Sequence, residues 1–407
     1  MAKSRHWAIG SAGALLCIAL VGCSSGDQPS AMDGTASSSS TSATGTGGAA
    51  GGSTATGGTA GSGGTAGSGG TGGNAVVAAG VRWFGRVDTA DAAKPRFAWS
   101  GSGFVAQFSG TSLSVKMSND GAFIFKPVVD GAAKPVFSAS AGQASYDLAT
   151  GLSAGPHVVA LYRQTEGTYG NSQFLGLTAA GGMSVDPPAG SGRLIEVVGD
   201  SITCGYGDLG MAPTCDFSFE TESHWDAYES VAARELNADL STIAFSGRGV
   251  YRNYDGSTID TIPKLYDRIL TNTSSPTWDF AEQPQAVVIN LGTNDFHDGD
   301  PGITFTNAYL AFVRNIRTRN PNALIVCAIG PMLSDGYPPG QMQLTKARTY
   351  VSEVVSTRRG EGDLKIDFLE FQEQTPDDWG CAYHPNRDKH KLMGDALATE
   401  LKTKLGW

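Results

Sequence analysis

Four short polar segments of the chain could together perform acyl transfer. Ser201 lies in the segment GDSIT (199–203), directly after an apolar run, and the pair Ser246-Gly247 follows a second apolar run. Asn294 follows a third run, and His384 precedes the last helical stretch near the C-terminus. Acyl transfer requires a nucleophile, a base that takes its proton, and donors that hold the oxyanion. The sequence offers a residue type for each of these roles.

The apolar runs before these segments predict the strands of a parallel sheet. We expect buried strands at 194–198, 242–245, 286–291 and 324–329, and helices at 225–236, 304–319, 341–357 and 389–404. Strands that alternate with helices in this way predict an α/β domain of flavodoxin-like type, with helices on both faces of the sheet. Ligands bind at the carboxyl ends of such strands, where all four polar segments fall.

The region before this domain has a different pattern. Short runs of alternating apolar and polar residues, separated by turn residues, occur at 103–108, 112–117, 123–129 and 157–162. A period of two at this spacing indicates an antiparallel sandwich of jelly-roll type. We therefore predict two domains, an all-β sandwich at 75–185 and an α/β domain at 186–407.

The N-terminus has the composition of an export signal. Lys3 and Arg5 precede an apolar run that ends in the segment LVGC (20–23). This segment resembles the lipobox of bacterial lipoproteins, which implies a signal peptide at 1–22 and lipidation of Cys23. An ordinary cleaved signal with a chance cysteine is the alternative. Residues 23–74, rich in Gly, Ser and Thr, would form a flexible linker, and the protein would be exported and anchored at the outer membrane or cell surface.

Composition excludes several other classes of function. The formal net charge is -10 and the pI is about 5.1, which disfavours a nucleic-acid binder because phosphate contacts require clustered Lys and Arg. The six His residues are scattered and show no paired Cys/His spacing, so we expect neither a metal site nor a cofactor. Because a tethered enzyme has no evident need of partners, we expect a monomer.

The four segments, in this order, resemble those of the SGNH (GDSL) hydrolases. The flanking residues extend the resemblance to carbohydrate esterase family 2. They include the segments GDSITCGYG (199–207), TE (221–222), SGRGVYRNY (246–254) and VINLGTNDF (288–296). In the predicted sandwich, the segments GLSAGPH (151–157) and RQTEG (163–167) are similar to that family's N-terminal domain. We expect Arg163 and Glu166 of the last segment to pack at the domain interface.

The resemblance implies a role for each polar segment. Ser201 would be the nucleophile and His384 the base, with the backbone N–H groups of Ser201 and Gly247 and the side-chain amide of Asn294 holding the oxyanion. The implied activity is removal of O-acetyl groups from plant polysaccharides, such as acetylated xylan or glucomannan, through an acetyl-serine intermediate. The alternatives are another SGNH esterase, lipase or thioesterase, and a catalytically inactive carbohydrate-binding lipoprotein.

The group that orients His384 stays open. Many SGNH enzymes have an Asp three residues before the His, and here that position is Cys381. A backbone carbonyl could hold the imidazole, since an orienting group only fixes the tautomer, and Asp378 or Asp377 could do the same. Next to His384, the rings of Trp379 and Tyr383 are candidates for contact with substrate, with core packing as the alternative.

Four cysteines remain after Cys17 leaves with the signal and Cys23 carries lipid. In an exported protein these four can form disulfides. We predict a bond between Cys204 and Cys215, which closes a short loop, and another between Cys327 and Cys381. Four free thiols are the alternative.

Overall fold

The computed structural model describes residues 80–183 and 186–407. The predicted signal peptide, the lipidated Cys23 and the linker up to residue 74 lie outside these residues. Within the described ranges, no helix is both long enough and apolar enough to cross a membrane.

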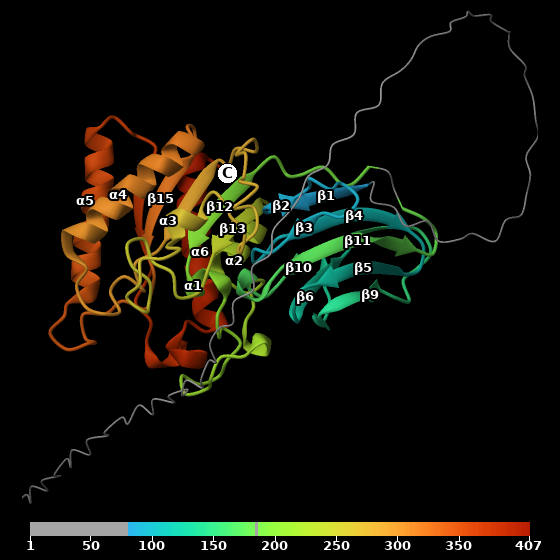
Figure 1. The fold of residues 1–407 in the computed structure, drawn as a ribbon, viewed down its shortest axis with the longest axis horizontal. Coiled ribbons are helices and arrows are strands. Elements are labelled where there is room, and N and C mark those ends of the chain that lie inside the picture. Colours follow the sequence, from blue (N-terminus) through green and yellow to red (C-terminus); the bar gives the residue numbers. More distant parts are fainter. Residues whose placement is uncertain (1–79, 184–185) are drawn as a thin grey trace, which may run out of the picture. The chain divides into compact units, whose positions relative to one another are not determined.

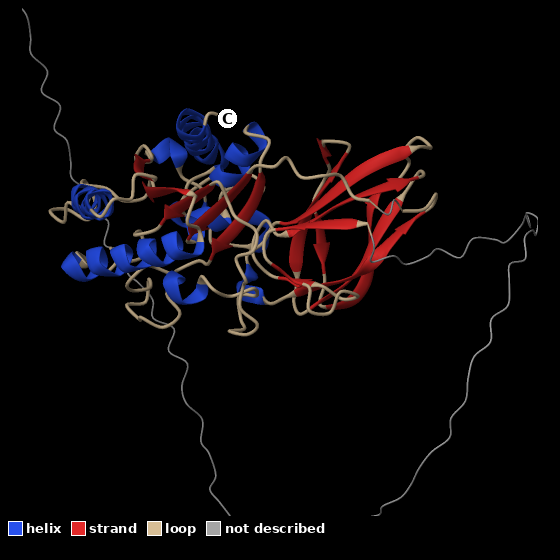
Figure 2. Ribbon diagram, turned by 90° about the horizontal axis from the view of Figure 1, so that it is seen from above, coloured by secondary structure: helices blue, strands red, loops and turns tan. Residues whose placement is uncertain are grey.

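The N-terminal domain is a sandwich of two antiparallel sheets (Figures 1 and 2). One sheet has the order β1 (Val81–Phe84), β4 (Gly103–Ser109), β10 (Pro156–Arg163), β6 (Phe123–Val129) and β7 (Ala132–Ala133), and β8 (Phe137–Ala139) also pairs with β6. The other has the order β2 (Val87–Asp88), β3 (Arg96–Phe97), β11 (Ser172–Ala179), β5 (Leu113–Asn119) and β9 (Gly142–Ala149). Alternation in β5 buries Leu113, Val115 and Met117, as the period of two predicts.

The C-terminal domain is built on a parallel sheet of five strands. Their order is β13 (Asp239–Ala244), β12 (Leu194–Gly199), β14 (Ala286–Asn290), β15 (Leu324–Ile329) and β16 (Ile366–Glu370). The order 2-1-3-4-5 is that of flavodoxin-like folds, so the predicted fold class is confirmed. We did not predict β16, because this edge strand is short, carries Asp367 and Glu370, and is only partly buried.

Helices cover both faces of this sheet (Figure 1). The helices are α1 (Ser201–Cys204), α2 (Tyr228–Glu235), α3 (Ile262–Leu265), α4 (Gly302–Arg319), α5 (Gln343–Gly360) and α6 (Arg387–Leu405). Short 3-10 helices lie at Gly167–Tyr169, Phe219–Thr221, Pro376–Asp378 and Cys381–Tyr383.

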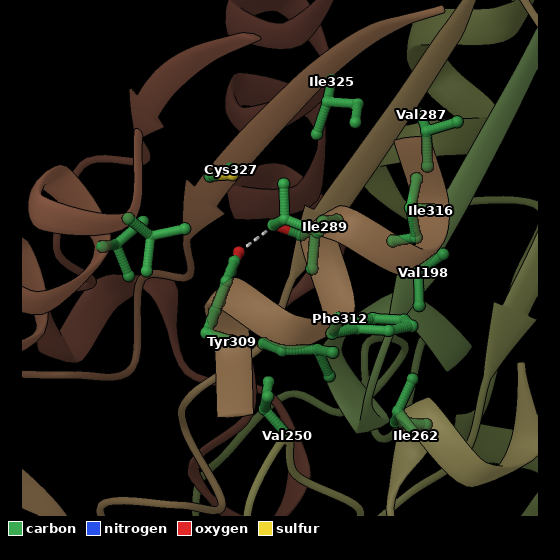
Figure 3. Close-up of a cluster of buried hydrophobic side chains, with 14 of the residues drawn as sticks. Val198, Val250, Ile262, Val287, Ile289, Tyr309, Phe312, Ile316, Ile325 and Cys327 are labelled. Carbon is green, nitrogen blue, oxygen red and sulfur yellow. Dashed lines mark hydrogen bonds between the residues drawn. The ribbon is translucent and has the colours of Figure 1, made fainter. Parts of the chain in front are cut away.

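Alternate residues of the strands pack against different helices. Val198 and Ile289 belong to a cluster with side chains of α3, α4 and α5 (Figure 3), whereas Val197 and Val288 pack with α2 and α6. Both faces of the strands are therefore apolar, which explains why they appear in the sequence as continuous apolar runs. Tyr309, deep in the first cluster, satisfies its hydroxyl by donating to the carbonyl of Ile289 at 3.4 Å (Figure 3).

Buried polar contacts join the sandwich to the α/β domain. Arg86, fully buried, pairs with Glu196 of β12 at 3.2 Å and donates to the carbonyl of Tyr266. The indole N–H of Trp99 donates to the carbonyl of Ile269 at 2.9 Å. Because a buried charge needs a partner, loss of either domain would leave the other with unpaired polar groups.

Candidate active site

Ser201 stands where β12 turns into α1. Asp200 caps the helix, and its side chain accepts the N–H of Ile202 at 3.1 Å. A Cβ at Gly199 would lie 1.9 Å from the hydroxyl oxygen of Thr203, so only glycine fits directly before this turn. The strand, the cap and the close approach at Gly199 together hold Ser201 at the carboxyl edge of the sheet.

His384 lies within hydrogen-bonding distance of this serine. Its Nε2 is 2.8 Å from the Oγ of Ser201, and its Nδ1 is 3.1 Å from the carbonyl oxygen of Ala382. A carbonyl oxygen can only accept, so Nδ1 carries the proton and Nε2 is left free to accept from Ser201. The pair is thus arranged as a nucleophile with its general base.

The backbone that presents this carbonyl is in an uncommon conformation. Ala382 and Tyr383 have φ values of +51° and +61°, in the left-handed region that residues other than glycine rarely adopt. The N–H of Cys381 donates to the carbonyl of Gly207 at 2.9 Å, and that of Ala382 to the carbonyl of Cys215 at 3.1 Å. A disulfide between Cys215 and Cys381 joins the same two segments. Strained backbone persists only where its surroundings hold it, and here three bonds do so.

The surroundings of His384 favour its neutral form. Burial among protein groups lowers the pKa of the imidazole to about 4, and only the hydrogen bond to Ala382 acts in the opposite direction. Among the residues that the structure describes, no carboxylate contacts the ring to stabilise a positive charge. The imidazole is therefore neutral at pH 7 and able to take a proton.

Neither carboxylate considered for orienting His384 does so. Asp378 accepts the backbone N–H of Thr375 at 2.8 Å and lies 3.4 Å from the ammonium of Lys389. Asp377 contributes only its carbonyl, which accepts from the amide of Asn386 at 3.0 Å. The carboxylate alternative is wrong, because a capping turn and Lys389 occupy Asp378 on the other side of this loop.

Both predicted disulfide pairings are also wrong. Cys215 pairs with Cys381, whereas Cys204 and Cys327 are free and buried. The short loop between Cys204 and Cys215 favoured their pairing, but Cys204 ends α1 with its thiol directed at Glu166, 3.5 Å away. Cys327 lies in β15, within the apolar cluster of Figure 3.

Gly247 occupies a turn that requires glycine. The N–H of Arg248 donates to the carbonyl of Phe245 at 3.3 Å, which closes a β-turn, and Gly247 has a φ of +76° in its third position. A positive φ at this position defines a type II turn and sets the direction of the central peptide, which carries the Gly247 N–H.

Asn294 joins the nucleophile turn to the Gly247 turn. Its amide nitrogen donates to Asp200 at 3.2 Å and to the carbonyl of Arg248 at 3.0 Å. Both amide hydrogens are thus used within the protein, and donation to an oxyanion requires that one of them be released or shared. The role of Asn294 as an oxyanion donor stays a prediction.

Asp295 is a structural residue of the site that we did not predict. Its buried carboxylate accepts the N–H groups of Val250, Tyr251 and Arg252 at 2.9, 2.7 and 3.0 Å. Burial raises its pKa to about 6 despite these bonds. Its place directly after Asn294 was the only signal in the sequence, and it is equally typical of a turn.

Aromatic rings surround the dyad. Tyr206 lies 4.4 Å from the ring of His384 and stacks on Phe217 at 4.0 Å, and neither was singled out in the sequence. Trp379 and Tyr383, the predicted substrate contacts, meet edge to face at 5.3 Å, and Tyr383 is 52% exposed. Sugar rings have apolar faces that stack on such side chains.

No group of three or more His, Cys, Asp and Glu side chains within 80–183 and 186–407 is arranged to hold a metal ion. The chemistry described above uses only the serine, the imidazole and hydrogen-bond donors.

A serine hydrogen-bonded to a neutral histidine at the carboxyl edge of a parallel sheet is typical of serine hydrolases, and comparison with known proteins gives the family. Residues 83–188 match the model of the carbohydrate esterase 2 N-terminal domain, and residues 197–392 match the GDSL-like lipase/acylhydrolase family. A family two carbohydrate esterase from Clostridium thermocellum, solved in complex with cellohexaose, is 38% identical. The match covers 81% of this chain and 100% of that one, with a TM-score of 0.76. The chain therefore belongs to carbohydrate esterase family 2.

Two further relatives differ in length. The cellulase/esterase CelE of Acetivibrio thermocellus is 39% identical over 331 residues, which are 81% of this chain and 40% of that protein. The chain thus spans less than half of CelE. An acetylxylan esterase/glucomannan deacetylase of Cellvibrio japonicus is 28% identical, over 80% of this chain and 89% of that protein.

Proposed function

We propose that this chain removes O-acetyl groups from plant cell-wall polysaccharides such as acetylated xylan or glucomannan. The observation that carries the proposal is the 2.8 Å contact of Ser201 with a neutral His384. The names of the Cellvibrio japonicus and Acetivibrio thermocellus relatives support the carbohydrate ester as substrate class.

The reaction proceeds in two acyl transfers. Ser201 Oγ attacks the acetyl carbonyl while its proton moves to His384 Nε2. The N–H groups of Ser201 and Gly247 and the amide of Asn294 hold the resulting oxyanion. Collapse breaks the bond to the sugar oxygen, which takes the proton from His384 and leaves an acetyl-serine. Water then gives its proton to His384 and attacks the acetyl carbonyl. The bond from this carbonyl to Ser201 Oγ breaks, Ser201 takes the proton back from His384, and acetate leaves.

Aromatic rings beside the dyad suit a sugar chain as the acyl donor. Tyr383 is the exposed member of its pair, and Tyr206 forms the wall next to His384. In the proposed complex a sugar ring stacks on Tyr383 while its acetyl group enters between Ser201 and the Gly247 turn.

The decisive experiment measures acetate released from acetylated xylan and acetylated glucomannan. Wild type should release acetate, and Ser201→Ala should lose about 10⁴-fold or more in kcat without loss of folding. A long-chain ester serves as control, since preferential hydrolysis of it would indicate a lipase. If wild type and variant were equally inert while wild type still bound the polysaccharide, the protein would be a carbohydrate binder.

We further propose that the enzyme is exported and held as a monomer at the outer membrane or cell surface by a lipid on Cys23. The support is the signal-like segment 1–22 and the Gly/Ser/Thr-rich segment that follows Cys23. The full chain expressed in a bacterial host should incorporate labelled palmitate, and Cys23→Ala should abolish the label. Labelling that persists in the variant would contradict the anchor.

A further inference from the structure

A buried carboxylate of the sandwich domain reaches the back of the active site. Glu166 follows β10, is 2% exposed, and accepts the backbone N–H of Ser246 at 2.9 Å. The same oxygen lies 3.5 Å from the thiol of Cys204, which donates to it. Ser246 directly precedes Gly247, and Cys204 ends the helix that Ser201 begins. One carboxylate oxygen of Glu166 therefore connects two parts of the site. They are the turn at Gly247, which we call the oxyanion turn, and helix α1, which begins at Ser201 and which we call the nucleophile helix.

The loop that carries Glu166 is fixed from several sides. Arg163, fully buried, donates to the carbonyls of Thr165 and Glu166 at 3.0 and 3.1 Å. The N–H of Glu166 donates to the carboxylate of Glu222 at 3.1 Å, and Thr271 donates to the carbonyl of Gly167 at 2.7 Å. Since its backbone is held on both sides, Glu166 presents its carboxylate at a defined position.

Cys204 stays in the thiol form that this contact needs. Burial, with the charges of Glu166 and Glu222 adding to it, raises the pKa of Cys204 well above its ordinary value. A thiol donates a weak hydrogen bond, so the bond to Ser246 is the stronger of the two. Loss of the Glu166 carboxylate would leave the Ser246 N–H without its acceptor next to the oxyanion turn.

We propose that Glu166 is a positioning residue, through which the sandwich domain holds the Ser246-Gly247 turn against the nucleophile helix and so preorganises the oxyanion site. The sandwich domain then contributes to the reaction itself. This role rests on the proposed esterase function, because it concerns the donors of the same site. It acts on the transition state, where the oxyanion forms, rather than on bound substrate.

Three variants of the full chain test this role, each assayed for kcat and KM on a short acetate ester. Glu166→Ala should lower kcat about 10- to 100-fold and leave KM within about threefold, because only the transition state uses the turn. Glu166→Gln keeps an oxygen acceptor for Ser246 and should stay within about threefold of wild type. Glu166→Asp is one methylene shorter, which lengthens and weakens the contact with the Ser246 N–H, so its kcat should fall between those of the other two variants. If Glu166→Ala does not fold, Glu166→Asp becomes the decisive variant, and full activity of Glu166→Asp would overturn the proposal.

A boronic acid gives an independent readout, since it forms a tetrahedral adduct on the serine oxygen. Glu166→Ala should weaken binding of methylboronic acid by a factor similar to its loss in kcat. Folded Glu166→Ala with unchanged kcat and unchanged boronate affinity would overturn the proposal. A loss in Glu166→Gln as large as in Glu166→Ala would also overturn it, because the acceptor would then not be what matters.

Glu196 provides a matched control at the same domain interface. It is 4% exposed, pairs with Arg86 at 3.2 Å and accepts the hydroxyl of Tyr266 at 2.6 Å, and within the described part of the chain it has no hydrogen bond or ion pair with the oxyanion turn. Glu196→Ala should lower the melting temperature but preserve kcat. If kcat fell equally in Glu166→Ala and Glu196→Ala, the effect of Glu166 on kcat would come from general stability and not from positioning of the oxyanion turn. If wild type hydrolyses no ester at all, the proposed function fails, while the boronate comparison still tests Glu166.

Discussion

Ser201 and His384 lie 2.8 Å apart, but two very different pieces of structure hold them. Ser201 begins a helix that follows a buried parallel strand, with Asp200 as cap and a glycine on the inner side of the turn. His384 follows two residues in the left-handed region and is attached to the rest of the domain by a disulfide and backbone hydrogen bonds.

The difference shows what holds each of the two side chains in its position. A strand and a capped helix repeat geometry that many sequences adopt, so Ser201 is placed by local structure. His384 depends on long-range bonds that hold strained backbone in one conformation, and its orientation comes from the single carbonyl of Ala382. We therefore expect substitutions near Ser201 to weaken stabilisation of the transition state. Substitutions near His384 should instead act by disordering the loop that carries it.

Among the residues that surround the two catalytic side chains, the largest effect is expected at Asn294, on the nucleophile side. Asn294→Ala removes the predicted oxyanion donor and the link between Asp200 and Arg248, and should lower kcat about 10²- to 10³-fold. Steady-state kinetics on an acetylated polysaccharide, with thermal unfolding as the control for folding, measure this. A folded variant with less than a threefold loss would exclude Asn294 from the oxyanion site.

A smaller effect is expected from opening the histidine loop. The double variant Cys215→Ser/Cys381→Ser should lose about 2–5 kcal/mol of stability and about 10- to 100-fold in kcat, because a small displacement of the base is costly. Cys327→Ala removes a free buried thiol that forms no disulfide with the loop and serves as control for kcat. Unchanged kcat in the double variant would mean that the hydrogen bonds of Cys381 and Ala382 suffice to hold His384.

The pH dependence distinguishes a dyad held by a carbonyl from one held by a carboxylate. With a pKa of about 4, His384 is neutral above that pH, so kcat/KM should persist under mildly acidic conditions and fall only near pH 4. The same lowered pKa disfavours the protonated ring in the folded state, so it reduces stability as pH falls from about 6.5 toward 4. An inflection of kcat/KM near pH 6.5 would show that the imidazole is not desolvated.

The smallest effect is expected at Asp378. Asp378→Asn should leave kcat within about threefold of wild type, whereas loss of the orienting Asp of a true triad costs about 10⁴-fold. Its contact with Lys389 should contribute about 1–3 kcal/mol to stability, because the Lys389 side chain is 2% exposed and that of Asp378 18% exposed, so solvent screens the pair little. A loss in kcat of more than 100-fold would restore Asp378 as a member of a triad. Kinetics and thermal unfolding on the same preparation separate the two effects.

Much of the fold followed from periodicity. The runs at 194–198, 286–291 and 324–329 correspond to strands β12, β14 and β15, because a parallel strand buried on both faces is apolar throughout. Edge strand β16 lacks this pattern, since its neighbours protect only part of it. The alternating runs of the sandwich were informative because strands such as β5 bury every second side chain.

By itself, the sequence determined the order of the two domains, the class of reaction and the four residue types that could perform it, because periodicity and short motifs are local properties of a chain. Only the tertiary structure decided that Cys381 pairs with Cys215, that the carbonyl of Ala382 contacts His384, and that Glu166 of the sandwich accepts the N–H of Ser246. Cys215 and Cys381 are separated by 166 residues, and Glu166 and Ser246 by 80. Which of several chemically suitable groups meet across such separations depends on how the folded elements direct their side chains, and no local pattern records it.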